Sequence, residues 1–298
     1  MTRMRRLFGS LVVFTGLLAT VALAQGPFTF VAVDGVELHV RQAGSAVPNT
    51  PIVVFENGLG TPLMSWIRVQ DQLASDTRTV IYDRAGIGRS KPSDEVPTPI
   101  NISRRLHALL AQLGAPPPYV LVGHSYGGPL VQFYAATYPG EVAGLVLVDP
   151  TDAAVDMQEV WNKAGAPDGR AWDDKARQQA ATSAPAGVRA EIEQMLKDEG
   201  DGFAVFKGLS VPDVPIGILL AGRMTSPIGG ESFPGNFESF ASAMIAQRID
   251  HFGRRARGSK NGFMTLVGTS DHFIQTRDSD VVVWAIRRVL KASTAAPK

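Results

Sequence analysis

The sequence predicts a single α/β domain whose mostly parallel β-sheet is flanked by helices. Short apolar runs are the first observation, because strands that are buried on both faces show no polar alternation. Segments of helical period lie between these runs, which is the order that parallel strands with crossover connections require. The third observation is size: 298 residues with 45% apolar composition are enough to bury a large core.

Composition and charge exclude several classes of protein. The 29 lysines and arginines nearly balance the 28 aspartates and glutamates, so the sequence indicates no basic surface for nucleic acid. The chain has no cysteine, which excludes disulfides, thiolate metal sites and a cysteine nucleophile. No group of histidines and carboxylates has metal-ligand spacing. We therefore expect neither a metal nor another cofactor.

Residues 1–24 have the features of an export signal. Three arginines precede an apolar run over residues 7–23, and residues 22–24 supply the small-x-small pattern that signal peptidase accepts. As a helix this run would be about 26 Å long, which is short of the roughly 30 Å hydrocarbon core of a bilayer. We expect cleavage after Ala24, export to the periplasm or the medium, and no stable membrane insertion of the mature chain. An uncleaved membrane anchor is the alternative.

Eight segments are predicted to be strands. The first two form an antiparallel hairpin around the turn dipeptide Asp34-Gly35. The other six are short apolar runs of the kind found in buried parallel strands. In chain order the eight segments are residues 28–33, 36–42, 52–55, 79–82, 119–122, 145–148, 216–221 and 263–267.

Two helices have clear boundary signals. Thr98-Pro99 is an N-cap followed by proline at the first helical position, and apolar residues then recur at helical spacing up to Gly114. Residues 280–290 place their apolar side chains on one face, which predicts a final amphipathic helix.

Residues 151–212 interrupt the alternation of strands and helices. They are rich in alanine, glutamine and charged residues and show helical stretches but no strand pattern. We interpret them as a helical lid inserted between strands six and seven, over the sheet edge where ligands bind in such folds. Residues 25–150 and 213–298 then form the core. A helical excursion without a gating role is the alternative.

The strongest chemical signal surrounds Ser125. The predicted strand 119–122 leads directly into Gly123-His124-Ser125-Tyr126-Gly127, and a helix-compatible segment follows. A tight strand-to-helix turn of this kind projects a serine hydroxyl into a pocket. Backbone segments come close around such a turn, so Gly123 and Gly127 must lack side chains. The pattern predicts a nucleophilic serine.

With these motifs the chain resembles the α/β-hydrolase superfamily along essentially the whole mature sequence. Glu56-Asn57-Gly58-Leu59-Gly60 is similar to the family's oxyanion loop, with Asn57 where the family usually has histidine. Asp83-Arg84-Ala85-Gly86-Ile87-Gly88-Arg89-Ser90 is similar to the family's turn after strand four. The resemblance implies the superfamily's eight-stranded sheet. It also implies that the backbone N–H groups of Tyr126 and Leu59 bind the oxyanion.

A serine hydroxyl needs a general base to become nucleophilic at neutral pH. Among the five histidines, His272 follows the last predicted strand and precedes the final helix, which is the family's position for the base. His251, in a polar arginine-rich stretch, is the alternative base. His39, His107 and His124 are interpreted as structural.

Three residues are candidates for the acid that orients the base. Asp149 ends the predicted strand 145–148 in a Leu-Val-Asp-Pro context similar to that of pancreatic-type lipases, and an orienting acid belongs at a strand end beside the histidine loop. Most relatives place the acid after the strand that follows the lid, where Glu231 is the first carboxylate of this chain. We predict Asp149, with Glu231 and Asp152 as alternatives.

These features predict a serine hydrolase that cleaves an ester or related acyl bond of a small molecule through an acyl-enzyme. An exported aminopeptidase, lactonase, acyltransferase or carbon-carbon bond hydrolase is the alternative on the same fold. Epoxide hydrolases and haloalkane dehalogenases are disfavoured, because those relatives carry aspartate at the position of Ser125. A non-catalytic ligand-binding member is the alternative from another class. The sequence does not indicate an oligomeric state.

Overall fold

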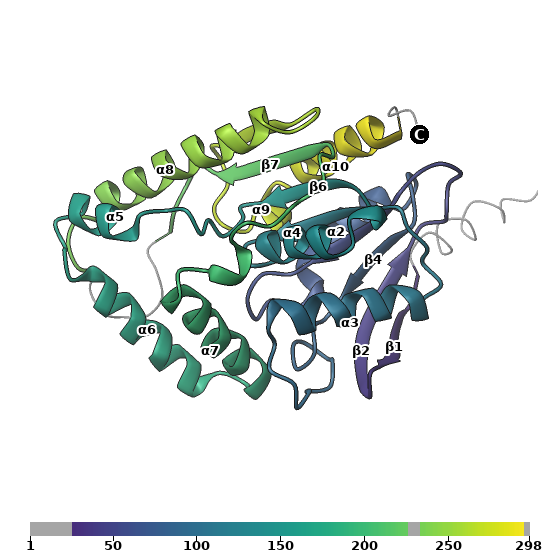
Figure 1. Cartoon of the computed structure of the whole chain (residues 1–298), viewed down its shortest axis with the longest axis horizontal. Coiled ribbons are helices and arrows are strands. Elements are labelled where there is room, and N and C mark those ends of the chain that lie inside the picture. Colours follow the sequence, from purple (N-terminus) through teal and green to yellow (C-terminus); the bar gives the residue numbers. More distant parts are fainter. Residues whose placement is uncertain (1–25, 226–232, 295–298) are drawn as a thin grey trace, which may run out of the picture.

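The computed structural model describes residues 26–225 and 233–294. Its centre is an eight-stranded sheet in the order β1-β2-β4-β3-β5-β6-β7-β8 (Figure 1). β2 is antiparallel to both of its neighbours, and every other neighbouring pair is parallel. The predicted mostly parallel sheet of eight strands is thereby confirmed. The proposed signal segment, residues 1–24, and the acid candidate Glu231 lie outside the described residues.

The strands occupy the predicted segments with small changes at their ends. The hairpin between β1 and β2 turns at Asp34 and Gly35, both at positive φ, as a tight two-residue connection requires. The strands are β1 (Phe28–Val33), β2 (Val36–Ala43), β3 (Ile52–Glu56), β4 (Thr79–Tyr82), β5 (Tyr119–His124), β6 (Val142–Val148), β7 (Ile216–Ala221) and β8 (Phe263–Val267).

Helices and short 3-10 turns form the remaining regular structure. The predicted cap of α3 is present, because the Thr98 side chain accepts a hydrogen bond from the Asn101 N–H. The elements are η1 (Leu63–Trp66), α2 (Ile67–Leu73), α3 (Pro99–Gln112), α4 (Gly127–Thr137), η2 (Pro139–Glu141), α5 (Met157–Lys163), α6 (Gly169–Ser183), α7 (Ala186–Gly200), η3 (Ala204–Phe206), α8 (Phe237–Arg257), α9 (Ile274–Arg277) and α10 (Ser279–Thr294).

Alternate residues of the central strands contribute to two apolar cores. On one face of the sheet, residues such as Val54 and Leu121 pack with α3, α4 and α8. On the other face, residues such as Val53 and Val120 pack with η1, α2 and α10. Because both faces are covered, the central strands carry apolar residues at successive positions.

The segment between β6 and β7 contains α5, α6, α7 and η3, and it has a small apolar core of its own. α6 packs on α7, and α5 packs on α8, which follows β7 (Figure 1). Trp161 of α5 is buried against Phe240 and Ala243 of α8. This cluster is separate from the two cores of the sheet, so the helical segment is a distinct layer beside them. In residues 26–225 and 233–294, no helix is both long enough and apolar enough to cross a membrane.

Candidate active site

Ser125 lies on the turn between β5 and α4 with a φ of 50°. Positive φ is unfavourable for a residue with a side chain, so the surroundings must hold it. The Ser125 N–H donates to the Val148 carbonyl at 3.1 Å, and the Ser125 carbonyl accepts from the amides of Gly128 and Thr151 at 2.9 Å each. These three bonds hold the strained turn and connect it to the end of β6.

The glycines on either side of Ser125 are required by close backbone contacts. A Cβ atom at Gly123 would lie 2.3 Å from the Gly127 carbonyl oxygen, and one at Gly127 would lie 2.5 Å from the Glu56 carbonyl oxygen. Neither distance is possible for a real side chain. The need for glycine at both positions, predicted from the sequence, follows directly from this geometry.

Asp149 and His272 are brought together from the ends of two strands. Asp149 follows β6, His272 lies between β8 and α9, and Asp149 Oδ2 is 2.6 Å from His272 Nδ1. The other oxygen, Oδ1, accepts from the Ala221 N–H at 3.0 Å and pairs with Arg248 at 2.9 Å. Because Nδ1 of His272 is engaged by the carboxylate, its Nε2 is left to exchange a proton with another group. The His272 side chain is 45% exposed.

The charges around Asp149 favour its ionised form. Burial alone raises the pKa of this carboxyl, but the hydrogen bond with His272 and the positive charge of Arg248 outweigh burial and lower the pKa to about 2. Asp149 is therefore a carboxylate at neutral pH. A carboxylate beside Nδ1 fixes the orientation of an imidazole and stabilises its protonated form.

The other acid and base candidates lie elsewhere. Asp152 Oδ2 is 3.0 Å from Nδ1 of His251, which lies on α8. The structure thus pairs the two alternative residues with each other, and it places Asp149 beside His272.

His124 connects the serine turn to the His272 loop. Its Nε2 is 2.8 Å from the His272 carbonyl oxygen, and the two imidazole rings are 4.7 Å apart between centroids. Burial, together with repulsion from His272, lowers the pKa of His124 to about 3, so this ring is neutral. Among the described residues, Ser125 Oγ makes no hydrogen bond to His272. Hydrogen bonds of this kind are often long before a substrate binds.

The backbone amides of Leu59 and Tyr126 are the predicted oxyanion donors. Within residues 26–225 and 233–294, neither N–H donates a hydrogen bond to another group of the protein. Their side chains belong to one apolar cluster with Ile102, Leu130, Met195 and Phe206. Met195 and Phe206 come from the segment between β6 and β7, so this segment supplies part of the apolar wall beside the two amides.

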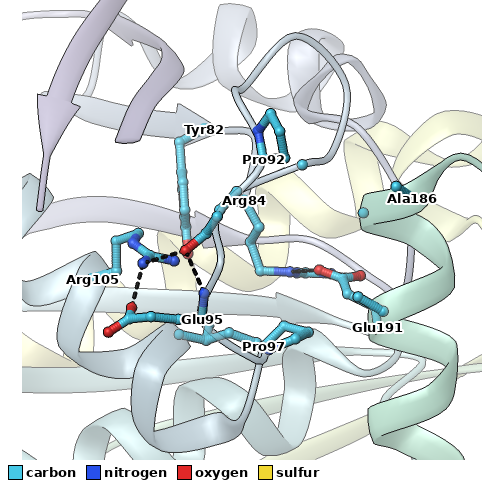
Figure 2. A pocket seen from close by; sticks show the side chains of 14 residues that line it. Tyr82, Arg84, Pro92, Glu95, Pro97, Arg105, Ala186 and Glu191 are labelled. Carbon is cyan, nitrogen blue, oxygen red and sulfur yellow. Dashed lines mark hydrogen bonds and ion pairs between the residues drawn. The ribbon is translucent and has the colours of Figure 1, made fainter. Parts of the chain in front are cut away.

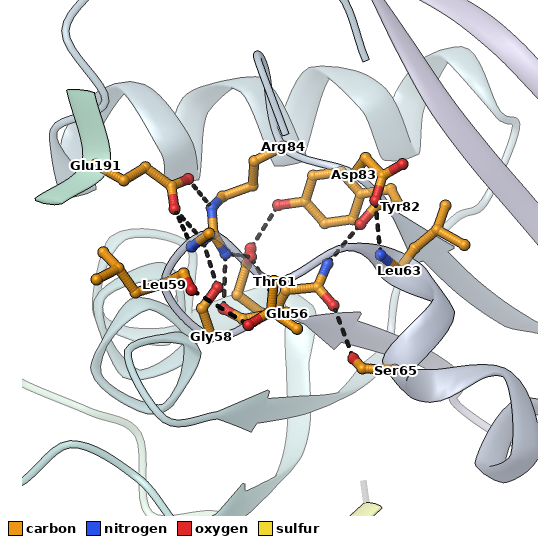
Figure 3. Close-up of polar contacts among 12 residues, drawn as sticks. Glu56, Gly58, Leu59, Thr61, Leu63, Ser65, Tyr82, Asp83, Arg84 and Glu191 are labelled. Carbon is orange, nitrogen blue, oxygen red and sulfur yellow. Dashed lines mark hydrogen bonds and ion pairs between the residues drawn. The ribbon is translucent and has the colours of Figure 1, made fainter. Parts of the chain in front are cut away.

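A buried arginine supports the loop that carries Leu59. Arg84 donates to the carbonyl oxygens of Asn57 at 2.6 Å and Gly58 at 2.8 Å, and it pairs with Glu56 at 2.7 Å (Figure 3). The Asn57 side-chain amide donates to the Tyr82 carbonyl at 2.7 Å. The asparagine therefore ties the loop to the end of β4. Burial raises the pKa of Glu56 although Arg84 pairs with it.

The chain matches one family model and shares its fold with solved structures. Residues 51–188 match the model of the α/β hydrolase fold. The structure superposes with a TM-score of 0.64 on a protein of Acinetobacter baumannii AYE that is provisionally designated a lipase, at 17% identity over 97% of this chain and 99% of that one. These matches support an α/β-hydrolase superfamily member, and the sheet has the α/β-hydrolase fold. At this level of identity the structural likeness defines the fold alone.

Curated relatives of this α/β-hydrolase match over part of their length. It is 33% identical over 120 residues to the uncharacterised protein YqjL of Bacillus subtilis, covering 40% of this chain and 46% of YqjL. It is 34% identical over 118 residues to the lipase LipV of Mycobacterium tuberculosis, covering 40% of this chain and 43% of LipV. The chain spans less than half the length of these relatives.

Two charged residues near the site were not identified from the sequence of this α/β-hydrolase. Arg248 of α8 pairs with Asp149, and Glu191 of α7 pairs with Arg84. Each partner is about a hundred residues away, so no local motif marks these contacts.

A cavity of about 100 Å³ lies beside Arg84 and Glu191, between the loop after β4 and the starts of α3 and α7 (Figure 2). Ser125, Asp149 and His272 do not line it.

The described part of this α/β-hydrolase contains no group of three or more histidines, aspartates and glutamates placed to hold a metal ion.

Proposed function

We propose that this chain is a serine hydrolase that cleaves an ester or related acyl bond of a small molecule. The observation that carries the proposal is the 2.6 Å contact between the Asp149 carboxylate and His272 Nδ1, at the strand ends where the strained Ser125 turn also lies. A carboxylate, an imidazole and a serine in that order are the components of a catalytic triad. Glu231 is an alternative acid that lies outside the described residues.

In the proposed reaction, His272 Nε2 takes the proton from Ser125 Oγ as this oxygen attacks the acyl carbonyl. The imidazolium then gives its proton to the leaving group, and an acyl-enzyme on Ser125 results. Water enters, loses a proton to His272 and attacks the acyl carbon. The bond between the acyl carbon and Ser125 Oγ then breaks, the imidazolium returns its proton to Oγ, and the acid leaves. Asp149 stays ionised throughout and holds the imidazole in the productive tautomer.

The oxyanion that forms in both steps is assigned to the backbone amides of Leu59 and Tyr126. Both are without a donor role in the described protein, and they adjoin one apolar cluster that an acyl chain would contact. Donors held in place before the reaction stabilise the transition state more than the ground state.

The arrangement of the chain suggests how the substrate reaches this site. We propose that residues 151–212 act as a lid, because Met195 and Phe206 of this segment pack beside Leu59 and Tyr126. We also propose that residues 1–24 are an export signal and that the mature enzyme works in the periplasm or the medium.

A fluorophosphonate probe and a substrate panel test the reaction. We expect the probe to label Ser125 in the folded protein, as located by mass spectrometry of the adduct. Ser125→Ala is expected to lower turnover of p-nitrophenyl esters by about a thousand-fold or more, because triad residues act as a unit. Ser183→Ala, at an exposed position of α6, is the control and should leave turnover unchanged.

Two outcomes would contradict the proposal. The first is near wild-type esterase activity in folded Ser125→Ala. The second is a folded wild-type protein that is not labelled and turns over none of the panel's p-nitrophenyl esters, lactones and aminoacyl amides, which would favour a ligand-binding member of the superfamily.

A further inference from the structure

A buried polar stripe runs along α7, a helix of the segment between β6 and β7. Glu191, Gln194 and Asp198 are spaced three and four residues apart, so they share one face of the helix. All three are buried, whereas Glu193 and Lys197 of the same helix are exposed. Burying a carboxylate is costly unless it has partners. The partners of this stripe therefore indicate its role.

Glu191 reaches the peptide groups on both sides of Leu59. Its Oε2 accepts from the Gly60 N–H at 2.8 Å, and its two oxygens hold Arg84 at 2.6 and 2.7 Å (Figure 3). Arg84 Nη2 in turn donates to the Gly58 carbonyl oxygen at 2.8 Å. Because a peptide group is planar and trans, a Gly58 carbonyl that points at Arg84 turns the Leu59 N–H the opposite way. Glu191 and Arg84 thus set the direction of this donor.

The far end of the stripe contacts the second donor residue. The Tyr126 hydroxyl donates to Asp198 Oδ2 at 3.2 Å, and the Gln194 amide donates to Asp198 Oδ1 at 2.7 Å. Tyr126 is buried, so its ring is fixed between the serine turn and α7. The two residues assigned as oxyanion donors are consequently both tied to one helix, Leu59 through its neighbours and Tyr126 through its side chain.

A direct backbone contact allows α7 to come this close. A Cβ atom on Gly187, near the start of α7, would lie 2.1 Å from the Gly86 carbonyl oxygen. Glu191 follows one turn later on the same face, where it meets Arg84, two residues before Gly86 (Figure 2). The glycine contact therefore sets the depth at which the carboxylate enters the core.

We propose that Glu191 and Asp198 are positioning residues for the oxyanion hole, so that α7 completes the catalytic machinery in addition to covering the site. The inference rests on the proposed serine hydrolase function and extends it. When α7 leaves the core, the Leu59 and Tyr126 amides lose their supports, and stabilisation of the oxyanion is lost together with the cover.

Glu191→Gln tests the positioning role against Glu193→Gln, which changes an exposed glutamate on the same helix. The Gln side chain keeps the shape of Glu191 but lacks the charge that holds Arg84. We expect kcat for p-nitrophenyl butyrate to fall about ten-fold with little change in KM, because the oxyanion donors act on the transition state. Affinity for an alkyl trifluoromethyl ketone should fall by the same factor, since its adduct with Ser125 places an oxyanion in the hole. Glu193→Gln should match the wild type in both measurements.

Ser125→Ala separates failure of this inference from failure of the proposed function. If Ser125→Ala keeps esterase activity, the serine hydrolase proposal is wrong and the inference falls with it. If Ser125→Ala is inactive while Glu191→Gln equals Glu193→Gln in kcat and in ketone affinity, the positioning role is overturned and the proposed function stands.

Tyr126→Phe tests the Asp198 end of the stripe independently of whether Glu191→Gln folds. It removes the hydroxyl that bonds Asp198 and keeps the backbone N–H. We expect kcat and ketone affinity to fall together by about three-fold at unchanged KM, a smaller effect than at Glu191 because a single hydrogen bond from a hydroxyl is lost. Wild-type values in a variant with a normal thermal unfolding midpoint would exclude a role for Asp198.

Discussion

Asp149 and Asp198 are buried to the same extent, 4% exposed each, yet the pKa values of their carboxyl groups are shifted in opposite directions. Asp149, at the end of a core strand, faces Arg248 and His272, and its pKa falls to about 2. Asp198, on the helical segment between β6 and β7, has neutral hydrogen-bond partners in Tyr126 and Gln194. Burial raises its pKa, because those bonds do not offset the loss of water.

The difference teaches that, at equal exposure, the charge of the partners decides whether the cost of burial is offset. Asp149 is kept ionised and is suited to stabilise an imidazolium. Asp198 is held by neutral donors and is suited to fix a position. The core thus contributes a charged carboxylate to the candidate site, and the helical segment contributes a carboxyl group that fixes a position.

The largest effect is expected from removing the charge of Asp149. Asp149→Asn should lower kcat by about a thousand-fold or more, because the amide favours the wrong tautomer of His272 and leaves its protonated form unsupported. Asp152→Asn is the matched control and should have little effect, since Asp152 bonds His251. Glu231→Gln is measured alongside. A larger loss in Glu231→Gln than in Asp149→Asn would assign the acid to Glu231 and break the comparison.

The pH dependence of stability should differ in sign between the two aspartates. Asp149, whose pKa lies below its ordinary 3.8, stabilises the fold above about pH 4 and loses this contribution as the pH falls toward 2. The advantage of the wild type over Asp149→Asn in free energy of unfolding should therefore grow by about 2 kcal/mol as the pH rises from 2 to 5.

Asp198, whose pKa is raised, contributes most below its ordinary value and less as the pH rises through and above that value. The stability of the wild type relative to Asp198→Asn should therefore decline with rising pH. Urea unfolding of the three proteins at a series of pH values measures both slopes. If the two stability differences changed with pH in the same direction, the partners would not control the pKa values of Asp149 and Asp198 as described.

A smaller effect is expected from Arg248. Its positive charge helps to lower the pKa of Asp149, so Arg248→Met should move the acid loss of folding stability to higher pH by about half a unit, as measured by urea unfolding. Arg254→Met, which changes an exposed arginine of the same helix, is the control. An unchanged pH profile of stability would show that the charge of Arg248 does not influence Asp149.

The fold was predictable where local pattern determines structure. The buried strands could be located because apolar runs such as residues 145–148 have no other stable environment than the middle of a sheet. α8 was not predicted, since its sequence looks like a polar, arginine-rich surface stretch. Its helix begins at the Asn236 cap and buries Phe240, Phe252 and a few small residues, which leaves only a weak apolar pattern.

The candidate site residues were selected by the same kind of local pattern. Ser125 and His272 follow strands in recognisable motifs, and Asp149 was favoured because it ends a strand. Glu191 and Asp198 were missed because a charged helix face is normally solvated. Their seven-residue spacing shows that they share a face. The partners of that face, Arg84 for Glu191 and Tyr126 for Asp198, are far away in the sequence, and only folding brings them near.

The contact between Gly187 and Gly86 sets a rule for exchanging the helical segment among related chains. Any transplanted segment would need glycine where its helix meets the turn at Gly86. It would also need an acidic residue one helical turn further on, to pair with the guanidinium of Arg84. Chimeras that meet both conditions should keep their turnover. In chimeras that match only the length of the segment, the Leu59 and Tyr126 amides should be poorly aligned.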